Sequence, residues 1–284
     1  MTIVSARPDR LSQAHQQLTS AIEHLVAGDD WRQMLDMARR FHAYSTNNVL
    51  LVLSQRPSAT RVAGFGTWKS LGRRVQKGEK GIAILAPLIT RTKAIDAREE
   101  TERPELVKVL RGFRVVYVFD VTQTEGDPLP DVIPTLLEDR APESVWEALA
   151  TQIASAGFTL GRGDCHGANG VTDFLTRTVT VRDDVGDAQA IKTLAHELGH
   201  VLLHDTPEYR GCRDRAEIEA ESVAYLLCQH VGITSDTYSF PYIARWSNGD
   251  TDAIRGTAER VITCARQILS AAGLVPEKRV PGAT

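Results

Sequence analysis

Two histidines separated by three residues place the strongest constraint on how this chain can fold. They lie in the stretch KTLAHELGHVLLH at residues 192–204, whose apolar residues recur at the spacing of a helix. Residues four positions apart on a helix share a face, so His196 and His200 can bind the same metal ion. Glu197, next to the first histidine, can take a proton from a metal-bound water. A pattern this short also arises by chance, so the rest of the chain must support it.

A third metal ligand is expected in the segment 215–228, where three glutamates open an otherwise apolar helix. A zinc site of this kind needs three protein ligands and an open position for water. Glu217 and Glu221 are four residues apart and share a helical face, whereas Glu219 points almost the opposite way. One of the pair can bind the metal while the other accepts a hydrogen bond from a ligand histidine. An acidic first turn favoured by the helix dipole would explain the same glutamates without a metal.

Composition excludes several classes of protein. The 284 residues are 42% apolar and 24% charged, which is typical of globular chains and suffices for one large domain or two ordinary ones. No apolar run is long enough to cross a bilayer, and the N-terminus lacks the hydrophobic stretch of a signal peptide, so we predict a cytoplasmic protein with no membrane partner. The four cysteines show no C-x-x-C spacing, which favours reduced thiols over a disulfide framework.

A basic segment in the first half predicts binding to single-stranded nucleic acid. Residues 56–80 hold seven basic side chains against one acid, Glu79, and the aromatic residues Phe65 and Trp68 lie among them. Cations can follow the phosphates while aromatic rings stack on unpaired bases. The alternative is a solvated, charged sheet face whose Trp68 belongs to the core. The residues predicted to contact DNA are Arg61, Trp68, Lys69, Arg73, Arg74, Lys77 and Lys80.

Periodicity predicts an α+β fold in two domains: N-terminal helices with a small antiparallel sheet, followed by a mainly helical domain with a small β-sheet, which the resemblance described below identifies as zincin-like. Residues 1–124 form the first domain, the proline-containing segment 125–142 is a linker, and residues 143–284 form the second domain. Asp30, Asp187 and Asp250 are the expected N-caps of three helices. In the second half we expect short strands at 158–160, 170–174 and 178–181 to form an antiparallel sheet ahead of the histidine helix.

Four stretches of the first half resemble the N-terminal domain of ArdC-type antirestriction proteins, which also occurs in plasmid primases of the TraC type. They are NNVLL from residue 47, RVAGFGTW from residue 61, VQKGEKG from residue 75 and FDVTQT from residue 119. The resemblance implies binding of single-stranded DNA, and an antirestriction role in which a mobile element shields incoming DNA during conjugation. The KGEKG run could equally be required for the geometry of the turn that it forms, and not for DNA binding, because glycine readily adopts positive φ.

Residues 188–229 resemble the zincin-type domain of ArdC and of the ImmA/IrrE metallopeptidases. The match rests on His196-Glu197-x-Gly199-His200 and on the later Glu-x-Glu-Ala run. It implies that His196, His200 and Glu217 bind Zn²⁺ or another divalent metal, that Glu197 is the general base of a zinc metallopeptidase, and that no nucleotide cofactor takes part. Many ImmA/IrrE relatives carry Asn or Asp where this chain has Glu221, so that residue remains the alternative ligand. The protein substrate is not identified by the sequence.

Two other interpretations of the metal helix stay open: a DNA-binding protein whose zinc site cleaves nothing, or a DNA-regulated peptidase that cleaves a repressor. A peptidase also needs a donor to the developing oxyanion, and Tyr209, Tyr225 and Tyr238 are the candidates. His204 is expected at the surface or behind the ligands, because eight residues carry it off the metal-facing line. The pair Cys165-His166 is expected to be a loop thiol and an exposed histidine rather than a metal-binding pair.

Overall fold

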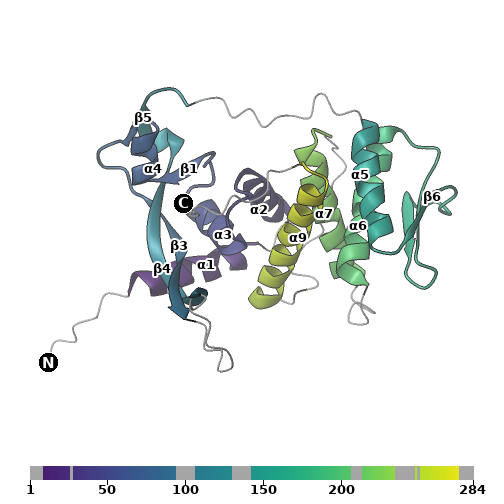
Figure 1. Ribbon diagram of the computed structural model, residues 1–284, viewed down its shortest axis with the longest axis horizontal. Coiled ribbons are helices and arrows are strands. Elements are labelled where there is room, and N and C mark those ends of the chain that lie inside the picture. Colours follow the sequence, from purple (N-terminus) through teal and green to yellow (C-terminus); the bar gives the residue numbers. More distant parts are fainter. Residues whose placement is uncertain are drawn as a thin grey trace, which may run out of the picture. The chain divides into compact units, whose positions relative to one another are not determined.

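The computed structural model describes residues 9–25, 28–93, 106–129, 142–205, 213–233, 247 and 250–274. The chain divides into two compact units (Figure 1). The first contains Met1–Ala21 and Asn47–Pro128, and the second contains Ile22–Thr46 and Leu129–Thr284. No helix in the described ranges is both long enough and apolar enough to span a bilayer.

The first unit is built on two long antiparallel strands, β3 (Ile82–Lys93) and β4 (Leu106–Asp120), with the short β1 (Val62–Gly64) on the other side of β4. Alternate residues of the sheet are buried, including Ile82, Ile84 and Val118, as the period of two requires. The remaining elements are α1 (Arg10–Glu23), α3 (Thr46–Gln55), α4 (Phe65–Ser70), β2 (Arg73–Val75), the 3₁₀ helix η1 (Val121–Gln123) and β5 (Thr124–Gly126), which pairs with β2.

Helix α3 covers the open edge of strand β3 with two amide side chains. The Nδ2 and Oδ1 atoms of Asn48 bond the carbonyl and N–H of Leu85, and Gln55 does the same for Ala83, all at 2.9 Å. Asn48 and Gln55 are seven residues apart, so they lie on one face of the helix, and their partners alternate along the strand. Backbone groups that an edge strand leaves unpaired are thereby satisfied.

Asp120 ties the end of β4 to the segment that precedes β1. Its Oδ2 accepts the N–H groups of Thr60 at 2.8 Å and Arg61 at 3.0 Å, while Oδ1 accepts the N–H of Thr122 at 3.0 Å. The backbone N–H of Asp120 donates in turn to Oε1 of Gln123 at 2.9 Å. Burial raises the pKa of Asp120, but these hydrogen bonds outweigh it and the pKa is lowered.

The second unit is mainly helical. Helices α5 (Pro142–Ser155), α6 (Asp187–His204), α7 (Arg213–His230) and α9 (Thr251–Ala271) pack in sequence, α5 on α6, α6 on α7 and α7 on α9 (Figure 1). Their buried faces include Leu149, Leu198, Val223 and Ile262. The predicted α+β class is confirmed, with small sheets in both units.

The sheet of the second unit differs from the purely antiparallel one expected. Its strands are β6 (Thr159–Arg162), β7 (Gly170–Asp173) and β8 (Thr178–Val181), in the order β6-β8-β7. The tight hairpin makes β7 and β8 antiparallel, whereas β6 pairs with β8 in parallel. The physical reason is the longer connection after β6, which lets the chain cross to the far side of β8 before turning back.

Helix α2 (Gly28–Arg40) belongs to the second unit, although it lies within the stretch predicted as the first domain. The Trp31 indole N–H donates to Oγ of Ser222 on α7 at 2.8 Å, in a fully buried contact. The Tyr225 hydroxyl, also on α7, donates to Oδ1 of Asp36 at 2.9 Å. The predicted boundaries at residues 124 and 142 remain predictions, and residues 130–141 lie outside the described residues.

Of the three expected N-caps, the structure confirms one. The Asp250 side chain accepts the N–H groups of Asp252 and Ala253 at the start of α9. The prediction was wrong for Asp187, because α6 is capped by Gly186 and Asp187 is its first helical residue. It was also wrong for Asp30, which lies inside the first turn of α2. Carboxylates in a first turn are still favoured by the helix dipole, which explains why the sequence signal is similar.

Candidate metal centre

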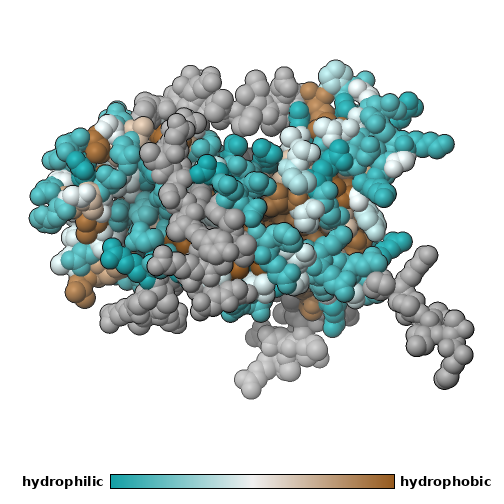
Figure 2. All heavy atoms as spheres, turned by 180° about the vertical axis from the view of Figure 1, so that it is seen from behind, coloured by the Kyte–Doolittle hydropathy of each residue, from teal (hydrophilic) through white to brown (hydrophobic). Residues whose placement is uncertain are grey.

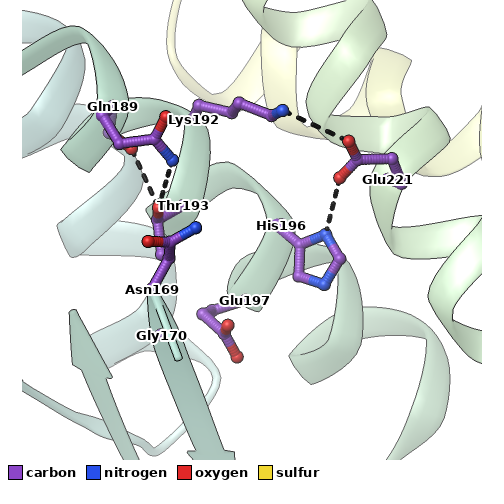
Figure 3. A pocket seen from close by; sticks show the side chains of 8 residues that line it. All are labelled: Asn169, Gly170, Gln189, Lys192, Thr193, His196, Glu197 and Glu221. Atoms are coloured by element: carbon purple, nitrogen blue, oxygen red, sulfur yellow. Dashed lines mark hydrogen bonds and ion pairs between the residues drawn. The ribbon is translucent and has the colours of Figure 1, made fainter. Parts of the chain in front are cut away.

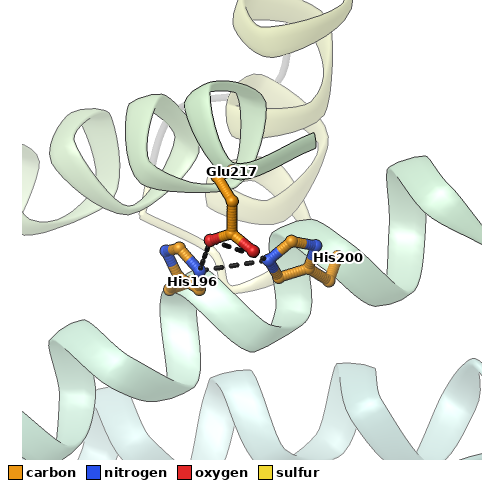
Figure 4. Close-up of side chains that lie close together, drawn as sticks. All are labelled: His196, His200 and Glu217. Atoms are coloured by element: carbon orange, nitrogen blue, oxygen red, sulfur yellow. Dashed lines mark hydrogen bonds and ion pairs between the residues drawn. The ribbon is translucent and has the colours of Figure 1, made fainter. Parts of the chain in front are cut away.

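Helices α6 and α7 bring together the three predicted ligands, His196, His200 and Glu217 (Figure 4). The two Nε2 atoms are 3.1 Å apart, and Oε2 of Glu217 lies 3.4 Å from Nε2 of His196 and 3.8 Å from Nε2 of His200. Donors that share a tetrahedral ion at about 2.0 Å are about 3.3 Å from one another. The three side chains therefore fit one small divalent cation, with a fourth position left for water.

Small residues let the two helices approach closely enough for this geometry. A Cβ atom added to Gly199, between the two histidines, would lie 3.1 Å from the Cα of Ala220 on α7. That separation is tighter than ordinary van der Waals contact. Gly199 and Ala220 thus set the spacing that carries Glu217 over the histidine pair.

Glu221 holds one ligand histidine rather than joining the three donors. Its Oε2 lies 3.1 Å from Nδ1 of His196, and its Oε1 lies 3.3 Å from Nζ of Lys192 (Figure 3). A carboxylate that accepts Nδ1–H leaves the Nε2 lone pair of the histidine for the metal. Of the two roles that the sequence left open, this geometry favours Glu217 as ligand and Glu221 as the acceptor.

The charges of the site also suit a cation. Burial lowers the pKa of His196, but hydrogen bonds to Glu217 and Glu221 outweigh it and raise the pKa to about 9. Hydrogen bonds from His196 and His200 lower the pKa of Glu217, with burial opposing them. Glu217 is therefore ionised near neutral pH, as a metal ligand must be, while a metal has to displace the proton on His196.

Glu197 faces strand β7 and is fixed by it. The Thr172 hydroxyl donates to Oε2 of Glu197 at 2.6 Å, and the glutamate is almost completely buried. A Cβ atom added to Gly170 on the same strand would lie 2.7 Å from Oε1 of Glu197 and 2.6 Å from Cγ2 of Thr193. Only glycine fits there without displacement. Neither Thr172 nor Gly170 was predicted, because nothing in the local sequence indicates which strand lies against α6.

A cavity of about 490 Å³ opens beside this glutamate, a volume within the range of ligand sites. Figure 3 shows the side chains that line it, which come from α6, α7 and the start of β7. They are Asn169, Gly170, Gln189, Lys192, Thr193, His196, Glu197 and Glu221. Because both Glu197 and a ligand histidine line the cavity, a substrate held there would lie beside the metal centre.

Of the three tyrosines named as candidate oxyanion donors, the structure describes only Tyr225. The Tyr225 hydroxyl is committed to Asp36, so the prediction for Tyr225 was wrong. Tyr209 and Tyr238 lie outside the described residues. His166 is exposed, as expected, whereas Cys165 is buried and donates to the carbonyls of Gly163 and Thr180.

The predicted DNA-contact residues fall into two groups. Trp68 is 2% exposed and its indole N–H donates to the carbonyl of Phe119 at 2.9 Å, so it is a core residue, as the alternative interpretation had it. Arg73 bonds the backbone of Thr124, Gly126 and Asp127 across the β2–β5 pair. The predicted contact is therefore corrected for Trp68, whose ring has no open face for a base.

The other predicted cations are exposed: Arg61, Lys69, Arg74, Lys77 and Lys80. Arg74 forms an ion pair with Glu125 at 2.7 Å. Phe65, which lies among the basic residues of the predicted segment, is 59% exposed, and two rings outside that segment are also exposed, Phe113 by 46% and Tyr117 by 44%. In the space-filling view, exposed apolar surface is broken into small areas by hydrophilic side chains (Figure 2). Exposed rings and exposed cations thus occur together in the first unit.

The fold and the site define an α+β protein with a two-histidine, one-glutamate centre formed by two adjacent helices. Comparison with protein families gives two matches. Residues 147–229 match the IrrE N-terminal-like domain, a peptidase family, and residues 9–119 match the N-terminal domain of anti-restriction factor ArdC. The chain therefore combines an ArdC-type N-terminal domain with an IrrE N-terminal-like domain.

Two solved structures share the fold of this chain, and one further protein is similar to it in sequence. The metal-free crystal structure of the antirestriction ArdC protein from plasmid R388 has a TM-score of 0.52 and 18% identity, covering 94% of this chain and 96% of that one. Its Mn(II)-bound structure has a TM-score of 0.51 and 19% identity, covering 94% and 97%. An uncharacterized protein of Bacillus anthracis is 25% identical in an alignment of 273 residues that covers 83% of this chain. The chain spans about half of that relative's length, 46%.

Proposed function

We propose that this protein binds single-stranded DNA through its first unit and cleaves a peptide bond at the metal centre of the second unit. We further propose that its biological role is antirestriction. The observation that carries the second part is the arrangement of three donor atoms at metal-sharing distances beside a buried, hydrogen-bonded Glu197. The first part rests on the ArdC-type domain and on the exposed cations and rings described above.

His196, His200 and Glu217 would hold the metal. Two imidazoles and a carboxylate are a donor set typical of catalytic zinc, so we propose Zn²⁺; the related R388 protein has a structure described as Mn(II)-bound, which makes Mn²⁺ the runner-up. A bound divalent cation supplies Lewis acidity, which lowers the pKa of water and polarises a carbonyl group.

Glu197 would move the protons of the reaction. Its Oε2 is held by the Thr172 hydroxyl, which leaves Oε1 as the atom that accepts a proton from the attacking water. The same carboxyl group then passes that proton to the departing amine. Glu197 is hydrogen-bonded to Thr172 on β7, and His196 is hydrogen-bonded to Glu221 on α7. These contacts fix the distance between the general base and the metal ligands.

The test of this proposal is cleavage of a fluorogenic peptide library by three forms of the protein loaded with Zn²⁺. Wild type should cleave, and Glu197→Gln should bind the metal normally but lose at least about a hundredfold in rate. His196→Ala should lose both metal and activity. Equal cleavage by wild type and Glu197→Gln would contradict the catalytic assignment. Normal DNA binding by an inactive wild type would instead favour the interpretation in which the metal site cleaves nothing.

A further inference from the structure

His204 lies one turn beyond His200 on α6 and is buried behind that ligand, which is one of the two positions expected for it. The Nδ1 atoms of the two rings are 2.9 Å apart. On its other side, Nε2 of His204 lies 2.9 Å from Oε2 of Glu219 on α7, whose side chain is completely buried. A continuous hydrogen-bonded row therefore leads from a metal ligand to a buried carboxylate.

Two arginines stabilise the ionised form of the Glu219 carboxylate. Oε1 of Glu219 lies 3.0 Å from Nε of Arg215 and 3.4 Å from Nε of Arg260 on α9. Nη2 of Arg260 also donates to the carbonyl of Leu203 at 2.9 Å, which fixes the guanidinium against α6. A buried carboxylate with two guanidinium partners is stable as the anion, and an anion can accept hydrogen bonds but not donate them.

The direction of every hydrogen bond in the row follows from this end point. Because Glu219 only accepts, the proton between it and His204 belongs to Nε2 of the histidine. A neutral His204 then has a lone pair on Nδ1, which accepts a proton carried by Nδ1 of His200. With its proton on Nδ1, His200 presents the lone pair of Nε2 toward His196 and Glu217, where a metal would lie.

We propose that His204 and Glu219 are positioning residues that set the tautomer and ring orientation of His200 for metal binding. The inference rests on the proposed metal site and adds a role for residues outside it. Each glutamate of α7 then has a distinct role: Glu217 binds, Glu221 orients His196 directly, and Glu219 orients His200 through a second imidazole. Removing an outer partner of this kind weakens metal binding about 10- to 100-fold in other metal sites.

The first measurement is Zn²⁺ affinity, by competition with a chromophoric chelator. Glu219→Gln and His204→Phe should each bind Zn²⁺ about 10- to 100-fold more weakly than wild type. His204→Gln should recover most of the affinity, because its amide can accept from His200 and donate to Glu219. Ser222→Ala is the matched control, because Ser222 lies on α7, is as buried as Glu219, and bonds Trp31 rather than a histidine. This variant should be less stable than wild type, while its Zn²⁺ affinity should stay within about twofold of wild type.

The second measurement is ¹⁵N NMR of histidine tautomers in the Zn²⁺-loaded protein. Wild-type His204 should carry its proton on Nε2 alone, and Glu219→Gln should lose this single state. A proton on Nδ1 of wild-type His204, or unchanged Zn²⁺ affinity in both Glu219→Gln and His204→Phe, overturns the relay while leaving the metal site intact. A wild type that binds no Zn²⁺ removes the metal site itself, so the two failures are distinguishable. If His204→Phe does not fold, Glu219→Gln and the rescue by His204→Gln decide.

Discussion

Single residues of the metal centre divide into those that the sequence predicts and those that only the fold supplies. His196, His200 and the pair Glu217 and Glu221 follow from helical spacing, because i and i+4 residues share a face. The same rule predicts that Glu219 points away from the metal. It cannot predict the hydrogen bond between Glu219 and His204, because that contact depends on how α6 and α7 pack. Local periodicity predicts which side chains share a face, whereas the partner of that face is a property of the tertiary structure.

Gly170→Ala should damage the site through a single methyl group. Its Cβ would lie 2.7 Å from Oε1 of Glu197, so either strand β7 or the glutamate must move, at a cost of about 1–3 kcal/mol in the free energy of unfolding. We expect at least about a tenfold loss of peptide cleavage and a lower thermal midpoint. Gly161→Ala on β6 is the matched control, since nothing lies within 4 Å of its added Cβ. Equal effects of the two substitutions would contradict the steric explanation.

Asp120→Asn should destabilise the protein at neutral pH and lose that effect in acid. The folded state lowers the pKa of Asp120, so its contribution is complete above the unfolded pKa of about 3.9 and is lost as pH falls through the folded value. We expect a loss of about 1–3 kcal/mol at pH 7, because buried N–H donors lose charged acceptors. Urea unfolding at pH 7 and near pH 3 measures it, with the exposed Asp184→Asn as a control that should change little. A pH-independent difference would show that the charge of Asp120 is not the cause.

Whole elements were predicted more reliably than their partners. The helix that Asp250 was expected to cap and the strands expected at 158–160, 170–174 and 178–181 correspond to α9, β6, β7 and β8, because periodicity and capping are local signals. The parallel pairing of β6 with β8 and the packing of α2 on α7 involve residues far apart in the sequence. Trp68 shows the same limit, since an indole among basic residues is equally consistent with a stacking ring and with a core residue.

Removing the amide side chains of α3 should open the edge of strand β3. Asn48→Ala would leave the N–H and carbonyl of Leu85 without their partner, which costs about 1–3 kcal/mol in the free energy of unfolding. Amide hydrogen exchange at Leu85 should accelerate, while Ala83, still bonded to Gln55, should change less. Asn47→Ala, one position earlier, is the control and should leave exchange at both amides as in wild type. Protection of Leu85 in Asn48→Ala would exclude this edge-capping role.

At the scale of the whole molecule, the two family matches do not coincide with the two compact units. The ArdC-type match at residues 9–119 includes α2, yet α2 packs on α7, the helix that carries Glu217, Glu219 and Glu221. The first half of the sequence therefore supplies part of the support of the metal centre. A linker and a composition change could not reveal this, because they locate a boundary along the chain and not the unit to which each helix belongs.

Binding of single-stranded DNA should depend on the exposed lysines of the first unit. Replacing Lys69, Lys77 and Lys80 with alanine removes three phosphate partners, so affinity should fall at least about tenfold and the slope of log K against log salt should decrease by about 2. Fluorescence anisotropy with a labelled oligonucleotide measures both, and wild type should prefer single strands over duplex.

Arg74→Ala is the matched control for that experiment, since Arg74 is exposed but paired with Glu125, and it should change affinity less than the triple variant.

The two aromatic residues Trp68 and Tyr117 should behave differently. Trp68→Ala should lower thermal stability, because the ring lies in the core. Tyr117→Ala should weaken DNA binding without destabilising the fold, because its ring is exposed and can stack on bases. An unchanged salt slope in the triple lysine variant would exclude this surface. Binding of duplex as tight as of single strands would remove the requirement for exposed bases, and with it the role of Tyr117.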